Sequence, residues 1–134
     1  MLSRFVVLSV SLTRKVSLLQ DYFDPSSYKS QPEMLKLLEH GSRNRFATLL
    51  WYMQAPAEGG ETHFPRAGGL PPNQAVGDCT SDGGVKVAPV SGSATLFYSL
   101  RPDGAVDPWS MHAGCPPTSG KKWAVNKWIW NRPL

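Results

Sequence analysis

The fold is decided near the C-terminus, by the stretch Asp107–Trp130 with the sequence DPWSMHAGCPPTSGKKWAVNKWIW. It contains two strand-like runs, Trp109–Ala113 and Lys122–Trp130, which flank a Pro-Pro-Thr-Ser-Gly segment. Prolines fix φ and glycine permits a reversal of the chain, so this segment predicts a turn. Two antiparallel strands joined there would bring His112 and Lys122 close together.

These two side chains suggest a binding site, although a simpler interpretation also fits. Histidine is a common ligand of borderline metals, and lysine is a positive charge suited to a carboxylate. The same pattern fits an ordinary strand histidine and a solvated lysine. On His112 and Lys122 alone, both interpretations stay open.

Length and composition favour one loop-rich β domain. The chain has 134 residues, of which 41% are hydrophobic, and it contains 12 glycines and 12 prolines. This length suits one domain at most. The many turn-forming residues favour a β protein over a helical bundle.

The charge pattern argues against two classes of partner. The formal net charge is +4, but Lys and Arg are scattered, and the longest basic runs are Arg14-Lys15 and Lys121-Lys122. We therefore expect no nucleic-acid partner. Because no apolar run reaches about 20 residues, we also expect no membrane span.

Further strands and turns precede the C-terminal stretch. A proline at the first turn and apolar residues at helical spacing predict a short helix over Pro32–His40. Glycines and prolines with few apolar residues predict an exposed loop over Pro65–Asp82. Aromatic and β-branched runs predict strands at Arg45–Met53, Glu61–Phe64, Val85–Ala88 and Ser93–Leu100. Short strands with frequent turns indicate a β sandwich or jelly roll.

In the predicted strand Arg45–Met53, the period of two places Phe46, Thr48, Leu50 and Tyr52 on one face.

The first 19 residues leave three interpretations open. The apolar run Phe5–Leu12 follows a single arginine and has the length of a signal-peptide core, but no clear cleavage site follows it. The run also fits a buried strand. A misplaced start of translation is the third interpretation.

Taken together, the motifs resemble the prolyl 4-hydroxylases of the plant and algal type, which are Fe(II)- and 2-oxoglutarate-dependent dioxygenases. The resemblance covers roughly residues 20 to 130. It rests on His112-Ala-Gly-Cys115-Pro116, Gly120, Lys122-Trp123, Lys127-Trp128, Val85–Pro89, Ser93–Leu100, Gly59-Gly60-Glu61-Thr62, Arg45–Met53 and Asp21-Tyr22-Phe23.

The resemblance implies a mainly β fold, the double-stranded β-helix or jelly roll. It also implies an N-terminally truncated chain, without the family's N-terminal supporting helices and strands. We therefore expect a divergent segment over residues 1–19 and a partial dioxygenase domain over residues 20–134.

The family holds Fe(II) with two histidines and one carboxylate, which leaves positions for the co-substrate and O2. The resemblance assigns two of these ligands, Asp21 and His112. Leu19 stands where the family carries the first histidine. Two other histidines are candidates to replace it, but the pattern favours neither. His40 lies in a predicted polar loop, and strand alternation points His63 away from the face of Thr62.

The resemblance assigns the 2-oxoglutarate pocket to Lys122, Thr62 and Tyr52. A dianion entering a low-dielectric barrel requires a positive charge at its far end, and Lys122 provides one. The hydroxyl of Thr62 can hydrogen-bond a carboxylate, although a β-branched residue is also ordinary in a strand. Ascorbate is implied as the reductant that rescues oxidised iron.

The resemblance places Arg45 and Trp128 in a groove for proline-containing peptides. An aromatic wall suits proline rings, and an arginine can donate to a peptide carbonyl. Trp128 also fits the hydrophobic core. Trp130 stands where many relatives carry histidine, which changes the expected peptide preference.

The chain contains two cysteines, Cys79 and Cys115. Plant and algal relatives carry cysteines at similar places, so we predict a disulfide between them. Two free buried thiols are the alternative. An even count fits an oxidising compartment, and with the family's usual location this predicts the endoplasmic reticulum or secretory pathway.

The expected function is therefore prolyl 4-hydroxylation of peptides, with activity made doubtful by Leu19. One alternative is a dioxygenase acting on another residue or a small molecule. Another is a catalytically inactive jelly roll that binds a peptide or protein.

Overall fold

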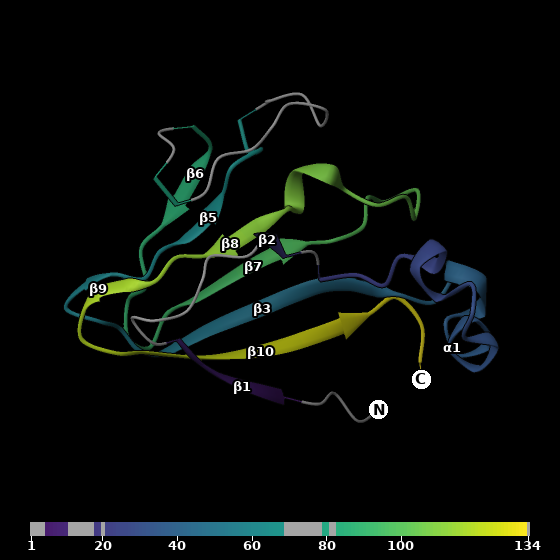
Figure 1. Cartoon of the computed structure of the whole chain (residues 1–134), viewed down its shortest axis with the longest axis horizontal. Coiled ribbons are helices and arrows are strands. Elements are labelled where there is room, and N and C mark those ends of the chain that lie inside the picture. Colours follow the sequence, from purple (N-terminus) through teal and green to yellow (C-terminus); the bar gives the residue numbers. More distant parts are fainter. Residues whose placement is uncertain (1–4, 11–17, 20, 69–78, 81–82, 134) are drawn as a thin grey trace.

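Two four-stranded antiparallel sheets form the body of the protein in a computed structural model of the chain (Figure 1). The structure describes the backbone of residues 5–10 and 18–19, and both backbone and side chains of residues 21–68, 79–80 and 83–133. The described part is mainly β, as predicted.

The larger sheet has the strand order β1-β10-β3-β7. Its strands are β1 (Phe5–Val10), β10 (Lys122–Trp130), β3 (Arg45–Gln54) and β7 (Ala94–Tyr98). The long aromatic and β-branched runs that form β3 and β10 pair along nearly their whole length. The N-terminal strand β1 pairs with β10 from Phe5 opposite Lys127 to Val10 opposite Lys122.

The smaller sheet has the order β2-β8-β5-β6. A separate two-stranded ladder is formed by β4 and β9. The smaller sheet is built from β2 (Leu18–Leu19), β8 (His112–Gly114), β5 (Thr62–Phe64) and β6 (Val85–Val87). The ladder pairs β4 (Glu58–Gly59) with β9 (Pro117–Ser119).

The predicted hairpin between the strands of His112 and Lys122 is wrong. In the structure β8 pairs with β2 and β5, whereas β10 pairs with β1 and β3. The predicted turn Pro116–Gly120 contains β9 instead, and it carries the chain from one sheet to the other. The two strands therefore face each other across the sandwich.

Trp109 also differs from its prediction as a strand residue. It lies in the 3-10 helix η3 (Pro108–Ser110), whose N-cap Asp107 accepts a hydrogen bond from the backbone nitrogen of Trp109. Pro108 suits the first position of that turn because its φ is fixed near the helical value.

Short helices gather at one end of the sandwich (Figure 1). They are η1 (Pro25–Tyr28), α1 (Pro32–Leu37) and η2 (Glu39–Gly41). The predicted helix Pro32–His40 thus ends early. Glu39 and His40 have φ of 48° and 55°, a left-handed conformation that stops an α-helix.

A β-bulge decides which residues of β3 face the smaller sheet. Trp130 pairs with Arg45 and Ile129 with Ala47, so Phe46 is the extra residue. The prediction that Phe46 shares a face with Thr48 is wrong: its ring packs 5.1 Å from that of Tyr98, which lies opposite Ala47. The bulge also returns Arg45 to the inner face.

The core lies between the sheets. Leu50, Tyr52 and Ala124 form a buried cluster, against which Phe97 of β7 packs. On the opposite face of the larger sheet, several large apolar side chains are exposed, among them Trp51, Met53, Leu96 and Tyr98. Buried polar residues interrupt the core on the inner face, among them Thr48 and Lys122, and these belong to the candidate site.

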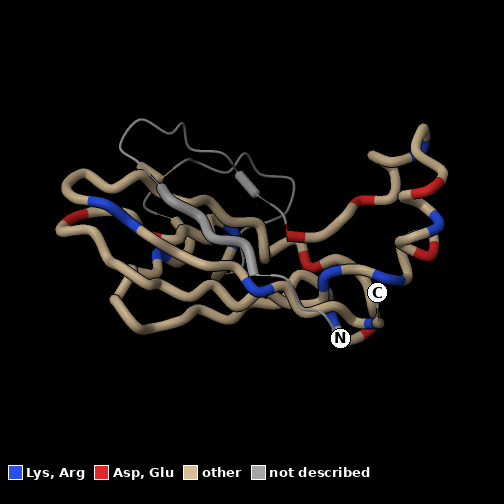
Figure 2. The backbone as a smooth tube through the Cα atoms, turned by 90° about the horizontal axis from the view of Figure 1, so that it is seen from below, with Lys and Arg blue, Asp and Glu red and all other residues tan. Residues whose placement is uncertain are grey.

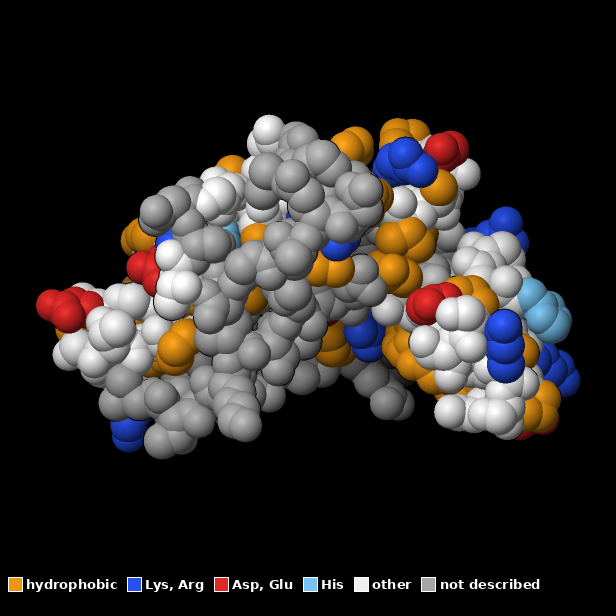
Figure 3. All heavy atoms as spheres, turned by 45° about the horizontal axis from the view of Figure 1, so that its top comes forward, with side chains coloured by type: hydrophobic (Ala, Val, Ile, Leu, Met, Phe, Trp, Pro, Cys, Tyr) orange, Lys and Arg blue, Asp and Glu red, His pale blue; other side chains and the backbone are white. Residues whose placement is uncertain are grey.

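Positively and negatively charged residues are interspersed along the backbone, and both kinds occur at the end that carries α1 (Figure 2). In Figure 3 the surface is hollowed between the sandwich and this helical end, with hydrophobic and basic side chains around the hollow. Within the described residues, no helix has the length and apolar character of a membrane span.

Candidate functional site

His112 and Asp21 meet in a buried position between the sheets. They are 5% and 8% exposed, and His112 Nε2 lies 3.9 Å from Asp21 Oδ2. Two bonds of about 2.0–2.2 Å to a shared cation can span that separation. The structure thus brings together the two predicted metal ligands.

A backbone contact orients the ring of His112. Its Nδ1 lies 3.0 Å from the carbonyl oxygen of Ser110, which can only accept, so Nδ1 carries the hydrogen. Nε2 is therefore the ring nitrogen that faces Asp21 and could bind a metal there. The rings of Phe97 and Phe64 hold the imidazole from its sides, with centroids 4.7 and 5.6 Å away.

Thr48 orients the carboxylate of Asp21. Its Oγ1 donates a hydrogen bond of 2.8 Å to Asp21 Oδ2, and Thr48 is fully buried on the inner face of β3. Carboxylates that bind a metal are usually held in this way by a hydrogen bond from a neighbouring group. Alternation along β3 predicts that Thr48 shares a face with Leu50 and Tyr52, but the sequence indicates no role for Thr48.

The donor set does not complete a facial triad. No group of three or more His, Cys, Asp or Glu side chains able to hold a metal occurs in the described part of the chain. The backbone register places Leu19 directly opposite His112. Asp21 and His112 are therefore two candidate ligands for Fe(II), and no third candidate lies beside them among the described residues.

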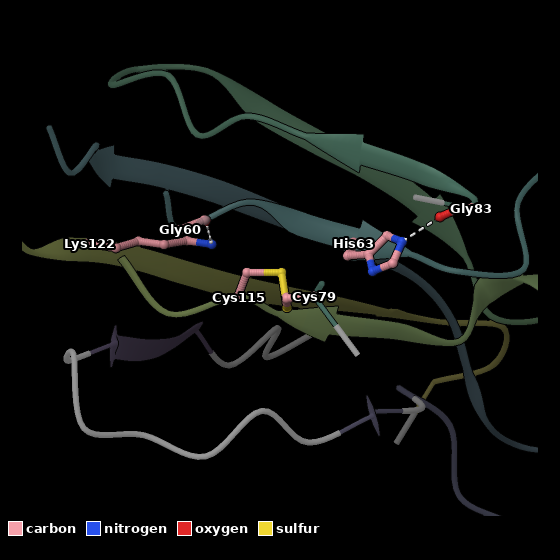
Figure 4. Close-up of a disulfide and its surroundings, with 6 residues drawn as sticks. All are labelled: Gly60, His63, Cys79, Gly83, Cys115 and Lys122. Atoms are coloured by element: carbon pink, nitrogen blue, oxygen red, sulfur yellow. Dashed lines mark hydrogen bonds between the residues drawn. A yellow bond between two sulfur atoms is a disulfide. The ribbon is translucent and has the colours of Figure 1, made fainter. Parts of the chain in front are cut away.

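Neither alternative histidine supplies the missing ligand. His63 is fully buried, and its Nε2 lies 2.7 Å from the carbonyl oxygen of Gly83 (Figure 4). His63 stands opposite Ala113 in the ladder, one residue from His112 and so on the other face of the sheet. His40 is exposed in η2 at the helical end.

Lys122 is a buried ammonium group at the other end of the inner face. It is 2% exposed, and its Nζ donates a 2.6 Å hydrogen bond to the carbonyl oxygen of Gly60 (Figure 4). Burial lowers the pKa of Lys122 to about 8, opposed by the negative charge of Glu61. Among the described residues, no ion pair includes this lysine.

Gly60 shows why the Gly-Gly motif precedes Thr62. Its φ is +78°, and a Cβ there would lie 2.8 Å from Pro56 Cγ and 3.4 Å from Lys122 Cδ. Only glycine allows the backbone to approach the lysine in this conformation. Sequence reasoning missed the carbonyl of Gly60 as a partner, because a backbone acceptor leaves no mark in the sequence.

Tyr52 and Thr62 provide hydroxyl groups near Lys122. Their oxygens lie 2.8 Å apart, and Thr95 Oγ1 donates to the Tyr52 hydroxyl at 3.2 Å. Lys122 Nζ lies 5.1 Å from the centroid of the Tyr52 ring. The three residues predicted to hold the co-substrate thus form one buried polar group joined by β3, β5 and β10.

Arg45 lies between two aromatic rings. Its guanidinium carbon is 3.6 Å from the ring centroid of Trp128 and 4.4 Å from that of Phe23. Burial lowers the pKa of Arg45, while the charges of Asp21 and Tyr28 act in the opposite direction. The two residues predicted to contact the peptide are therefore in direct contact with each other.

Cys79 and Cys115 form a disulfide, as the sequence predicts, with Cα atoms 5.6 Å apart (Figure 4). Cys115 follows β8, and its backbone nitrogen donates to the carbonyl oxygen of Glu61. The bond ties residue 79, in the segment between β5 and β6, to the strand that carries His112.

A family model described as the 2OG-Fe(II) oxygenase superfamily matches residues 18–130. The chain belongs to this superfamily. The family expectation is thereby confirmed, and so is the jelly-roll fold that it implies. Because the chain belongs to this superfamily, Fe(II) is the expected cofactor and 2-oxoglutarate the expected co-substrate of the candidate site that contains His112, Asp21 and Lys122.

Known proteins with similar sequences include plant prolyl 4-hydroxylases. Prolyl 4-hydroxylase 1 of Arabidopsis thaliana is 46% identical over 89 residues, which cover 63% of this chain and 29% of the relative. Probable prolyl 4-hydroxylase 9 of the same plant is 38% identical over 126 residues, 93% of this chain and 40% of the relative. The chain thus matches less than half the length of these relatives.

A solved structure supports the fold. The viral collagen prolyl hydroxylase of Paramecium bursaria Chlorella virus 1, crystallised as its 2OG complex, matches with a TM-score of 0.63 and 24% identity. The match covers 97% of this chain and 60% of the viral one.

Proposed function

We propose that the chain binds 2-oxoglutarate and Fe(II) and acts as a prolyl 4-hydroxylase-like dioxygenase on proline-containing peptides. The observation that carries the proposal is Lys122, a buried ammonium group without a carboxylate partner among the described residues. A buried charge is costly unless it is paired, so a carboxylate ligand is its natural complement.

The neighbouring side chains suit the rest of a 2-oxoglutarate molecule. The hydroxyls of Tyr52 and Thr62 offer hydrogen bonds to the carboxylate held by Lys122. Along β3, Leu50 separates Tyr52 from Thr48 on the same inner face, so an apolar step lies between the lysine end and the Asp21 end. A dicarboxylate with two methylene groups fits this order, with one carboxylate at Lys122, the methylene groups beside Leu50 and the other end at the candidate metal ligand Asp21.

The peptide would lie beyond the metal ligands, at Arg45 and Trp128. The flat Trp128 ring suits a proline ring, and the guanidinium stacked on it can donate to a peptide carbonyl. Proline-containing peptides are also the substrates expected from the similarity to plant prolyl 4-hydroxylases. Ascorbate is the proposed reductant. The disulfide supports a location in the endoplasmic reticulum or secretory pathway.

The test is succinate release from 2-oxoglutarate with Fe(II), ascorbate and a proline-containing peptide, together with calorimetric titration of 2-oxoglutarate alone. We expect 2-oxoglutarate to bind the natural chain and to bind the Lys122→Met variant too weakly to be measured. A matched control is Lys121→Met, because Lys121 is exposed beside it. Equal affinity in all three proteins would refute the assignment of the pocket.

A second candidate is favoured by Leu19. Because Leu19 lies opposite His112 and cannot coordinate a metal, the chain also fits a jelly roll that binds a peptide or protein without turnover. Peptide binding without succinate release, at saturating Fe(II) and 2-oxoglutarate, would support this candidate over the enzyme.

A further inference from the structure

Arg66 lies just beyond β5, at the end of the smaller sheet where His112 lies. Because β5 and β8 are antiparallel, the chain that leaves β5 runs toward the segment that precedes β8. The ring of Phe64, the last residue of β5, packs 5.6 Å from that of His112. Two residues further on, Arg66 Nη1 lies 3.5 Å from the carbonyl oxygen of Pro108, which begins the 3-10 helix η3 before β8.

Arg45 has the corresponding place on the larger sheet, at the start of β3. The segment that begins with the candidate ligand Asp21 contacts both arginines. The guanidinium of Arg45 lies over the ring of Phe23, with 4.4 Å between its carbon and the ring centroid. Burial raises the pKa of Tyr22, and the nearby charge of Arg66 acts in the opposite direction. The two arginines therefore flank the candidate metal position, one from each sheet.

Arg66 has no carboxylate partner among the described residues. Its Nε is buried without a hydrogen-bond partner, and the contact of its Nη1 is long for a hydrogen bond. Acidic side chains of the neighbouring segments bind other groups: Asp24 accepts from the Ser26 hydroxyl, and Asp107 from the backbone nitrogen of Trp109. A half-buried guanidinium with an unpaired donor suits a carboxylate from a ligand, which its planar fork can bind through two hydrogen bonds.

We infer that Arg66 is a specificity-determining residue that binds an acidic side chain of the peptide held by Arg45 and Trp128. The inference rests on the proposed peptide function and adds a sequence preference to it. Arg45 and Arg66 come from opposite sheets, and stacked sheets lie about 10 Å apart. A proline-rich peptide advances about 3.1 Å per residue, with three residues per turn. The acidic residue is therefore expected about three positions from the bound proline, on the same side of the peptide helix.

The experiment measures binding by fluorescence anisotropy, so it does not depend on turnover. Three labelled peptides are titrated into the full chain at low salt. Each has four prolines on either side of a central residue, which is glutamate, glutamine or lysine. Prolines on both sides let either peptide direction place the central residue three positions from a bound proline. We expect the glutamate peptide to bind about three- to tenfold more tightly than the glutamine peptide, and the lysine peptide to bind most weakly. High salt should reduce these differences.

Variants assign the preference to Arg66. Arg66→Gln removes the charge and should make the glutamate and glutamine peptides bind equally. Arg66→Lys keeps the charge without the planar fork and should retain only part of the preference. The matched control is Lys86→Gln, which removes the same charge from an exposed residue. Lys86 stands opposite His63, on the outer face of the smaller sheet, so this variant should keep the full preference.

Equal binding of the glutamate and glutamine peptides by the natural chain would overturn the inference. An unchanged preference in Arg66→Gln, or an equal loss of preference in Lys86→Gln, would overturn it as well. Each of these results leaves the proposed peptide function intact. Absence of binding by every peptide would refute the proposed function and this inference with it.

Discussion

Leu19 lies directly opposite His112 in the antiparallel ladder between β2 and β8. Directly opposed residues in such ladders have Cβ atoms about 4.5–5.5 Å apart. A histidine at position 19 would therefore stand within reach of a metal held by His112 and Asp21.

We predict that Leu19→His creates a three-ligand site. Under anaerobic conditions, Fe(II) at one hundred times its Kd should stabilise this variant by about 2.7 kcal/mol, which raises the thermal midpoint by several degrees. The natural chain should respond much less. Succinate formation, measured separately in air-saturated buffer with 2-oxoglutarate and ascorbate, should appear or increase in the variant.

The matched control for this prediction is Leu18→His. Leu18 pairs with Ala113, one residue away, so its register position belongs to the other face of the sheet. An equal Fe(II) response in the two histidine variants would show that position 19 is not the ligand position.

The hydrogen bond from Thr48 to Asp21 should tune metal affinity. In the Leu19→His background, Thr48→Val removes the donor while keeping the shape of the side chain, so we expect metal affinity to fall about 10–100-fold. Thr95→Val serves as the control, because Thr95 donates to Tyr52 at the other end of the inner face. Titration with Fe(II), followed by the thermal midpoint, measures both; equal affinities would remove Thr48 from the site.

Lys122 should make stability depend on pH. Its folded pKa of about 8 lies below the usual value of about 10.4, so between these values the unfolded chain binds more protons than the folded one. Stability from this group should therefore rise as pH increases from about 8 to 10.4. Below pH 8 the buried charge costs about 3 kcal/mol.

Lys122→Met should consequently be more stable than the natural chain at pH 7, by up to about 3 kcal/mol, and should lose that part of the pH dependence. Urea unfolding of both proteins at pH 7, 8, 9 and 10 gives the comparison. Parallel stability curves would contradict a lowered pKa at Lys122. A gain in stability with a loss of 2-oxoglutarate binding would mark the lysine as functional.

The disulfide should contribute to stability through the loop that it closes. With a sequence separation of 36 residues, replacing both Cys79 and Cys115 by serine should cost about 3–4 kcal/mol in the chain-entropy model. Urea unfolding of the double variant measures this loss, and the reduced natural chain should show a similar one. Unchanged stability in both would mean that the unfolded chain is not restrained by this bond.

The sequence predicted well what depends on local pattern. Long aromatic and β-branched runs marked β3 and β10, and alternation placed Thr48, Leu50 and Tyr52 together on the inner face. The roles proposed for Asp21 and His112 came from the family resemblance, since neither residue stands out by spacing.

What depends on pairing between distant strands could not be predicted. Three-residue strands such as β8 carry too little pattern to reveal their neighbours, so the predicted pairing of the His112 and Lys122 strands is wrong. The bulge at Phe46 arises from the register between β3 and β10 and is invisible in β3 alone. The contacts of Asp21 with Thr48 and of Lys122 with Gly60 join residues 27 and 62 positions apart.

Alternation along β10 constrains how this scaffold can evolve. Lys122, Ala124, Asn126 and Trp128 share the inner face, so inserting a single codon between the first and the last would turn one end of the strand outward. Two inserted codons would keep both ends inward and move them about 6.6 Å further apart. Descendants that adapt to a longer or shorter substrate should therefore differ in this strand by pairs of residues, or carry a compensating bulge like that at Phe46.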